Sequence, residues 1–391
     1  MISLREKLKM VKAGSSETKK PAEPQKAPLF MEENRVPAAV LTGVDRITLE
    51  EIRACEPTFT GTQWNLSDLL FLDTETTGLS GGAGTLAFEI GVGYFEQDSF
   101  MIRQYVIRDY PQEREMLEAI IALAKEHSTM VTFNGKTFDL PLIESRCIMN
   151  GLRFSFAGCP QLDLLHICRR VFKLRLGRCN LATLETAVLG TEREDDLPGA
   201  QVPQRFFDYL KTGEFGLIRD VLRHNYDDVL SMPKLLSRVA EAFRAPESLS
   251  YPEDIYGVGR TLMRGGHVRQ ARECYRILGH TKMAGHARLR LAESYKKDRD
   301  WEQTVSVCER MIAEGENGTW PYIELAKYYE HIQRDLDRAE QMSLRALSVL
   351  LNRMPLQNGS KERDQAEISG LYRRIERIRR KKERRDSNGT V

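Results

Sequence analysis

Strand-like segments of this chain fall within one window, and after about residue 165 every segment has the pattern of a helix. The first strand-like segment is the short apolar run LLFLD, residues 69–73. Residues 85–97 and 99–109 follow, with the tight turn EQDS between them. Three consecutive strands joined by short connections predict an antiparallel meander. The chain is therefore expected to build one sheet, followed by a long all-helical region.

Strand–helix units follow the meander. Residues 111–127 form an amphipathic pattern with a proline in the first turn, and residues 129–135 are another buried strand. Residues 139–151 are a helix that ends at a glycine. This order predicts an α/β domain with a mixed central sheet flanked by helices. Four more segments predict helices: DLLHICRRVF, NLATLETAVLG, PQRFFDYLKTG and FGLIRDVLRHNYDDVLSMPKLLSRVAEAF.

The chain divides into three regions. At 391 residues it is too long for one average domain. Residues 1–45 include the stretch SSETKKPAEPQKAP and have too little apolar area to offset the entropy of ordering, so a disordered tail or linker is expected there. The segment RAPESLSYPED, 244–254, marks a domain boundary. The α/β domain is therefore expected over 46–243, and a second domain over 250–385.

The second domain contains a repeat of 34 residues. Three sets of apolar residues recur at this spacing: Ile255, Leu289 and Ile323; Val258, Ala292 and Ala326; Ala271, Val305 and Ala339. This period predicts paired helices of the tetratricopeptide-like type, stacked into a short solenoid. A basic helix near 365–385, with Leu371, Ile375 and Ile378 on one face, is the expected cap. The usual tryptophan and helix-ending proline of such repeats are not in place, so an unrelated helical bundle is the alternative.

Composition excludes several classes of protein. The net charge is only +2, so the protein as a whole has no strongly basic field. Its seven cysteines are scattered and form no C-x-x-C pair, which argues against a disulfide framework and a zinc ribbon. The N-terminus has no apolar core of signal-peptide length, and no segment approaches the length of a membrane span. A cytoplasmic protein with no membrane partner is expected.

Four carboxylates and one histidine are candidates for a common site. Asp73 and Glu75 end the first strand and share one face of it, because side chains alternate. Asp139 begins a helix directly after a strand and a glycine turn. His224 and Asp228 are four residues apart on a helix and therefore on one face. Oxygen donors without cysteine suit hard cations, so we expect two Mg²⁺ or Mn²⁺ ions, held by these carboxylates.

Such a set of residues suits phosphodiester hydrolysis. Like charges packed this closely repel unless divalent ions neutralise them. Two ions about 4 Å apart can stabilise both the attacking and the departing oxygen of a phosphodiester. A histidine beside them can take the proton from the attacking water.

Three motifs resemble a known family. FLDTETTGLS (71–80), FNGKTFDLP (133–141) and HNYDDVLSM (224–232), in this order and spacing, are similar to the exonuclease motifs of the DEDD, or DnaQ-like, superfamily of RNase H-fold nucleases. Order, spacing and the helical insertion most resemble the bacterial YprB-like group. The resemblance covers about residues 65–242. Each motif alone is weak, whereas the three together are specific.

The resemblance implies a metal-dependent exonuclease that acts most often from a 3′ end. It implies that Asp73, Glu75, Asp139 and Asp228 hold the metals and that His224 is the base. In the family the histidine usually stands five residues before the last aspartate, and the tyrosine of a second subtype stands four before it. Here His224 occupies the tyrosine position, and Tyr226 lies on another face of the helix.

Further residues allow both a functional and a structural interpretation. Thr76, Thr77, Gly78 and Asn134 are expected to contact the terminal nucleotide, or only to shape turns and cap a helix. Asp163 is explained as the N-cap of a helix. The five basic residues after it either track a phosphate backbone or form an ordinary surface: Arg169, Arg170, Lys173, Arg175 and Arg178.

The main hypothesis is a 3′→5′ exonuclease acting in DNA repair, with DNA favoured and RNA possible as substrate. The helical repeats would recruit a protein partner such as a helicase. One alternative is a catalytically weak scaffold that only binds nucleic acid; another is a structure-specific endonuclease on the same fold.

Overall fold

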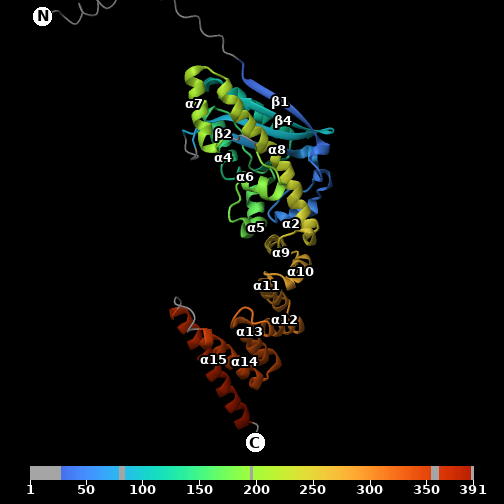
Figure 1. The fold of residues 1–391 in the computed structure, drawn as a ribbon, viewed down its shortest axis with the longest axis vertical. Coiled ribbons are helices and arrows are strands. Elements are labelled where there is room, and N and C mark those ends of the chain that lie inside the picture. Colours follow the sequence, from blue (N-terminus) through green and yellow to red (C-terminus); the bar gives the residue numbers. More distant parts are fainter. Residues whose placement is uncertain (1–27, 79–83, 194–196, 354–360, 389–391) are drawn as a thin grey trace, which may run out of the picture.

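The computed structural model describes residues 28–78, 84–193, 197–353 and 361–388. The molecule is elongated, with a sheet and its covering helices at one end and a curved row of helices at the other (Figure 1). Residues 1–27 of the expected tail lie outside the described residues. Within the described part of the chain, no helix is both long and apolar enough to span a membrane.

The N-terminal region contains a six-stranded mixed sheet, as expected. The strand order is β1-β4-β3-β2-β5-β6. The strands β2, β3 and β4 form the antiparallel meander, β1 pairs antiparallel with β4, and β5 and β6 run parallel to β2. The strand bounds are β1 (Phe30–Pro37), β2 (Leu69–Thr76), β3 (Ala87–Glu96), β4 (Ser99–Val106), β5 (Thr129–Thr132) and β6 (Gln161–Asp163).

The first strand corrects the predicted N-terminal tail. Residues 30–37 pair with β4 along their whole length, from Phe30 opposite Val106 to Pro37 opposite Ser99. Leu41 and Val44 are buried in the core, and the Ser237 hydroxyl donates a hydrogen bond to the Thr42 carbonyl at 2.8 Å. The tail assignment is therefore wrong for residues 30–45. The segment FMEENRVP has few apolar residues because an edge strand buries only one face.

Helices cover both faces of the sheet. Leu70 and Leu72 face a core built with α3 (Glu113–Glu126), α4 (Asp139–Met149) and α7 (Val202–Thr212). Leu69 and Phe71 face the opposite core, built with α2 (Leu49–Cys55), α5 (Leu164–Leu176) and most of the long α8 (Gly216–Arg244). A short helix, α6 (Leu181–Leu184), continues into a π-turn over Glu185–Leu189. The α/β architecture is therefore confirmed.

The C-terminal region is all helical, as expected. Three successive helix pairs are followed by one long helix, α15 (Lys361–Asn388) (Figure 1). Leu371, Ile375 and Ile378 of α15 are buried in the cores of this region. The assignment to tetratricopeptide-like repeats stays a prediction. The pairs are α9 (Pro252–Arg264) with α10 (Val268–Ile277), α11 (Ala284–Lys297) with α12 (Trp301–Ala313), and α13 (Trp320–Tyr328) with α14 (Leu336–Arg353).

The hydrophobic core continues across the segment expected to be a boundary. Helix α9 packs directly on α5, so closely that a Cβ atom on Gly257 would lie 2.4 Å from the carbonyl oxygen of Val171. The Arg175 guanidinium pairs with the buried Asp254 carboxylate at 2.8 Å. The first helix pair is thus fixed to the α/β region, and α5 is the element that joins them.

Candidate active site

The two carboxylates of the first motif end a central, buried strand. Leu69 to Leu72 are fully buried, which fixes β2 in the middle of the sheet. Asp73 and Glu75 follow on the face that α8 covers, because they alternate with Thr74 and Thr76. The pairing of β2 with β3 shifts register between Glu75 and Thr76, one residue before the strand ends.

Glycines on β3 allow α8 to approach these carboxylates. A Cβ atom on Gly91, which lies opposite Asp73, would be 1.9 Å from the Asn225 side-chain oxygen. A Cβ atom on Gly93 would be 2.8 Å from Val229. The absence of side chains at these positions therefore sets the distance between the sheet and the part of α8 that carries the third motif.

The approach of α8 brings three polar side chains to the end of β2. The Asn225 amide donates a hydrogen bond to Asp73 Oδ2 at 3.0 Å. His224 Nε2 lies 3.7 Å from Glu75 Oε1 and 3.9 Å from Asp228 Oδ2. Donor atoms of Glu75, His224 and Asp228 all lie within 4.8 Å of one another, the one such group of metal-capable side chains among the described residues.

Asp139 approaches from the other face of β2. It is the first residue of α4 and is buried, and its carboxylate accepts a hydrogen bond from the Thr74 hydroxyl. Thr74 stands between Asp73 and Glu75 on β2, so this bond places the Asp139 carboxylate at the same end of the strand. The structure thus brings five candidate side chains to the same end of β2, and their roles in catalysis and metal binding stay predictions: Asp73, Glu75, Asp139, His224 and Asp228.

The electrostatics of this group favour a bound cation. Burial and then repulsion from Asp228 and Asp139 hold the pKa of Asp73 well above its usual range. Burial and then repulsion from Asp73 do the same to the pKa of Glu75. Burial raises the pKa of Asp139 to about 6 and also raises the pKa of Asp228. Carboxylates arranged in this way ionise together only when positive charge is supplied.

An arginine that the motifs do not include supplies part of that charge. The Arg193 guanidinium lies 2.5 Å from Asp228 Oδ1 and 2.5 Å from Glu185 Oε1, and Glu185 also accepts a hydrogen bond from the Ser231 hydroxyl. Arg193 Nη1 is 3.5 Å from His224 Nδ1. No feature of the sequence points to Arg193, because it lies outside the regular elements and far from the motifs in the chain.

Glu89 and Gln104 form a second unpredicted group behind the site. Glu89 lies opposite Glu75 in the β2–β3 pairing and is fully buried. Gln104 Nε2 donates to Glu89 Oε1 at 2.9 Å and to Asn225 Oδ1 at 3.1 Å, which orients the Asn225 amide toward Asp73. Burial raises the pKa of Glu89 to about 8. In the sequence, Glu89 is one glutamate within the strand segment FEIGV, and nothing there indicates that it lies behind the site.

Of the four substrate-contact candidates, Thr76 ends β2, Thr77 and Gly78 follow it, and Asn134 follows β5. The Thr76 hydroxyl donates to the Gly78 carbonyl at 2.8 Å, and the Thr77 hydroxyl accepts from the Leu86 amide at 3.0 Å. Asn134 has a positive φ of 71°, and its side-chain oxygen accepts from the Thr137 hydroxyl at 3.1 Å. These bonds agree with turn-shaping roles for Thr76 and Thr77. Asn134 does not cap α4, because the N-cap of that helix is Phe138 and no side chain caps it. Contact of these residues with a substrate stays a prediction.

Asp163 connects this edge to α5. Its carboxylate caps α5 through the Leu165 amide at 3.1 Å, as the N-cap interpretation predicts. The same carboxylate also accepts from the backbone amides of Asn134, at 2.9 Å, and Lys136, at 3.2 Å. The turn after β5 and the start of α5 are therefore held together by one buried side chain.

Comparisons relate this chain to known proteins. Residues 70–240 match the RNase_H superfamily. The uncharacterized protein YprB of Bacillus subtilis (strain 168) is 31% identical over 314 residues, which are 77% of this chain and 74% of that protein. The family B DNA polymerase of the hyperthermophilic archaeon Pyrobaculum calidifontis is similar over 54% of this chain and 30% of the polymerase, with a TM-score of 0.39 and 15% identity.

The RNase_H match includes β2, the start of α4 and the first part of α8, the three elements that carry the carboxylates. Residues 70–240 form an RNase H-like domain, and the chain belongs to the same family as YprB.

Proposed function

We propose that this protein is a metal-dependent 3′→5′ exonuclease of the DEDD type. The observation that carries the proposal is the convergence of four carboxylates and His224 at the end of β2, with the pKa of each carboxyl group raised. The RNase H-like fold, whose members generally hydrolyse phosphodiester bonds, supports it. DNA is the favoured substrate and RNA the alternative.

The donors at this site fit divalent metal ions. Carboxylate oxygens with one imidazole suit Mg²⁺ or Mn²⁺ rather than a softer metal. Burial and mutual repulsion raise the pKa values of Asp73 and Glu75, so full ionisation of these carboxylates needs the positive charge that a divalent ion would supply. Asp73 and Glu75 would hold two ions jointly, with Asp139 on one side and Asp228 on the other. When bound, the ions would stabilise the negative charge that develops on the phosphodiester oxygens.

His224 would take the proton from the attacking water. Nε2 of its ring faces Glu75 and Asp228, and Nδ1 lies 3.5 Å from Arg193 Nη1. A guanidinium only donates hydrogen bonds, so an Nδ1 atom that accepts from Arg193 cannot also accept a proton from water. Action as a base therefore requires Arg193 to leave Nδ1, or the ring to turn. Asn225 and Gln104 would position Asp73 without touching the substrate.

A nucleic-acid-binding scaffold with weak catalysis is the second candidate. The ion pair between Arg193 and Asp228 favours it, because the guanidinium competes with a metal for that carboxylate. The four intact carboxylates favour the enzyme. In both cases the C-terminal helices would recruit a protein partner, such as a helicase, and the setting would be DNA repair in the cytoplasm.

Nucleotide release from an end-labelled single strand tests the proposal. Single-stranded DNA and its RNA counterpart are incubated with Mg²⁺, Mn²⁺ or EDTA, using wild type and Asp73→Ala. Metal-dependent shortening from the 3′ end, lost in the variant, is expected. Cleavage of a circular strand would instead indicate an endonuclease, and retained binding without cleavage would favour the scaffold.

A further inference from the structure

A strongly basic cavity lies between α5 and α9, away from the carboxylates. Its volume is about 620 Å³, and we call it the α5–α9 cleft. Five cationic side chains line it: Arg169, Arg170 and Lys173 from α5, and Arg260 and Arg264 from α9. Among the described residues, no carboxylate contributes to its lining. The opposing helices thus present one sign of charge to a common space.

Most of this charge is available to a ligand. Arg170 is engaged, since its guanidinium pairs with Glu56 at 2.5 Å. Arg169, Lys173 and Arg264 are exposed, and none of them forms an ion pair within the part of the chain that the structure describes. Like charges facing one another without counter-charges are unfavourable unless an anion joins them.

The basic C-terminal helix differs in this respect. On α15, Arg377 and Lys381 both pair with Glu330, at 2.6 and 2.7 Å. Lys382 pairs with Glu340 at 2.9 Å. Part of the densest positive run in the sequence therefore holds helices of this region together, whereas Arg169, Lys173 and Arg264 of the α5–α9 cleft form no ion pair among the described residues.

The cleft has rigid walls. The close contact of Gly257 with the Val171 carbonyl fixes α9 against α5. The Arg175 guanidinium, paired with buried Asp254, lies 4.1 Å from the centre of the Tyr251 ring. A site whose cationic side chains project from two fixed helices is preorganised, so that little order has to be created on binding.

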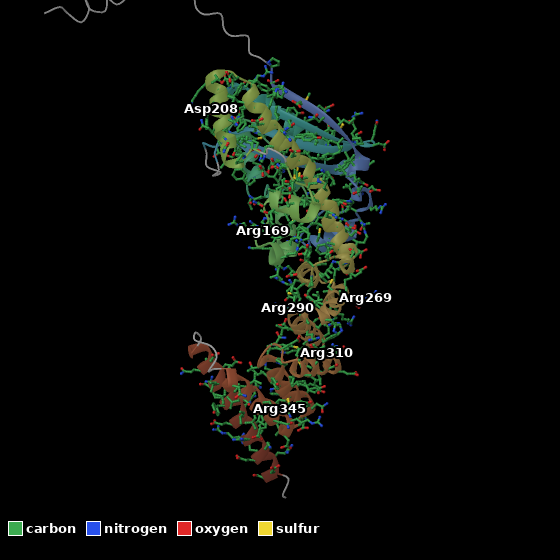
Figure 2. All side chains as sticks on the ribbon, viewed as in Figure 1. Arg169, Asp208, Arg269, Arg290, Arg310 and Arg345 are labelled. Carbon is green, nitrogen blue, oxygen red and sulfur yellow. The ribbon has the colours of Figure 1, made fainter. Side chains whose placement is uncertain are left out.

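The position of α5 connects the cleft to the candidate active site. Asp163 holds the start of α5 to the turn at Asn134 and Lys136, beside the end of β2. Arg169 and Lys173 lie four residues apart on one face of the helix. Lys173 is ten residues beyond Asp163, which is about 15 Å along a helix axis. Figure 2 shows Arg169 on the concave side of the molecule.

We propose that the α5–α9 cleft binds the phosphodiester backbone of the substrate strand, several nucleotides from the bond that is cleaved. This inference rests on the proposed nuclease function, because it places the strand end at Asp73 and Glu75. Phosphates would contact Arg169, Lys173 and Arg264, and α5 would guide the strand from the site edge to the first helix pair. The helical region would then extend the substrate path.

Binding of a labelled strand tests the proposal without cleavage. Fluorescence anisotropy with a single-stranded 25-mer, in EDTA, is measured for wild type and the triple variant Arg169→Ala/Lys173→Ala/Arg264→Ala over a range of salt. For a single strand, each phosphate contact contributes about 0.7 to the slope of log Kd against log salt. Loss of three contacts should therefore lower this slope by about 2. The affinity at low salt should fall by about tenfold or more.

A matched variant controls for net charge. Lys125→Ala/Arg153→Ala/Arg269→Ala removes three charges from exposed residues outside the cleft. It should bind almost as wild type does, and thermal unfolding should show that both triple variants are folded. Equal weakening in both variants, or wild-type binding by the cleft variant, would overturn the proposal and leave an acidic protein segment as the occupant.

A neutral strand identifies the contacted group. When the linkages beyond the terminal ones are uncharged methylphosphonates, wild type and cleft variant should bind equally; a difference that persists would exclude phosphate contacts. The measurements need no catalysis. If the wild-type protein releases nucleotides but the cleft variant binds the strand as tightly as wild type, this inference alone is rejected. If the wild-type protein releases no nucleotides but the cleft variant binds the strand more weakly, only the nuclease function is rejected.

Discussion

The Asn225 amide donates a hydrogen bond to Asp73 Oδ2 at 3.0 Å, and it does so across the gap between α8 and β2. Asn225 is fully buried, and Gln104 holds its other end at 3.1 Å. This bond lowers the pKa of Asp73 against the burial and repulsion that raise it. Asn225 is therefore the link between the helix of the third motif and the strand of the first.

Replacing Asn225 by alanine should make the carboxylates harder to ionise. The pKa of Asp73 is expected to rise further, because the lost bond to a charged group has a typical strength of about 1.5–3 kcal/mol. Mg²⁺ titrations followed by activity or by thermal shift should then require a higher pH to reach the same half-saturation. Gln104→Ala, which leaves the amide able to reach Asp73, should give a smaller shift. Equal shifts in the two variants would contradict this role of Asn225.

Gly91→Ala should separate α8 from the sheet. The added Cβ atom would lie 1.9 Å from the Asn225 side-chain oxygen, so α8 or Asn225 has to move. We expect a loss of stability of about 1–3 kcal/mol and a larger loss of nuclease activity. Chemical unfolding and nucleotide release measure the two effects. Gly216→Ala, at the start of the same helix, where no atom lies within 4 Å of a new Cβ, should show neither loss.

The metal-free protein should become less stable as pH rises. Burial raises the pKa of Asp139 to about 6 and that of Glu89 to about 8. Between their usual values and these values the folded protein binds more protons than the unfolded chain, so stability falls as pH rises through this window. With EDTA, Tm should be several degrees lower at pH 8 than at pH 5.5.

Divalent metal should reverse this trend. At pH 8, Mg²⁺ should raise Tm more than at pH 5.5, because it neutralises carboxylates that are otherwise forced to repel. Asp73→Asn should lose most of the Mg²⁺ effect and show a flatter pH dependence in EDTA. A Tm in EDTA that does not change between the two pH values would argue against a strained group of carboxylates.

The sequence predicts those parts of the site that depend on local pattern. Asp73 and Glu75 end an apolar strand, and His224 and Asp228 lie one helical turn apart, so their faces follow from strand and helix periods. Asp163 is likewise predicted as a cap, but its bonds to Asn134 and Lys136 depend on β5 and β6 being neighbours. The edge strand 30–37 was missed because its regular hydrogen bonds come from β4, and few apolar residues mark it.

Residues that act only through tertiary packing could not be predicted. Arg193 meets Asp228 because the segment after the π-turn returns over α8. Glu89 faces Glu75 because of the exact register of two strands, which a one-residue shift would undo. The α5–α9 cleft has the same origin: the sequence indicates the basic residues of α5, but only the packing of α9 on α5 brings Arg260 and Arg264 beside them.

Arg193→Ala should strengthen metal binding and weaken the fold. Without the guanidinium, Asp228 is available to a cation, and removal of a competing interaction of about 1 kcal/mol would lower the half-saturating Mg²⁺ concentration about fivefold. Glu185 would remain buried without its cationic partner, so Tm in EDTA should fall. Calorimetric Mg²⁺ titration and thermal unfolding measure the two effects. An unchanged Mg²⁺ affinity would mean that Arg193 does not compete with the metal.

Replacement of His224 and Tyr226 should show which side chain acts at the unusual spacing. His224 lies against Glu75 and Asp228, whereas Tyr226 lines a separate surface pocket with Glu32 and Asn34 of β1. Loss of a general base lowers the rate by about 10²–10⁴-fold, so His224→Ala should reduce nucleotide release by this factor while Mg²⁺ still raises Tm. Tyr226→Phe should release nucleotides at the wild-type rate. If instead Tyr226→Phe is the slower variant, the ring must reach the site through a movement of α8, and the assignment of His224 as base is wrong.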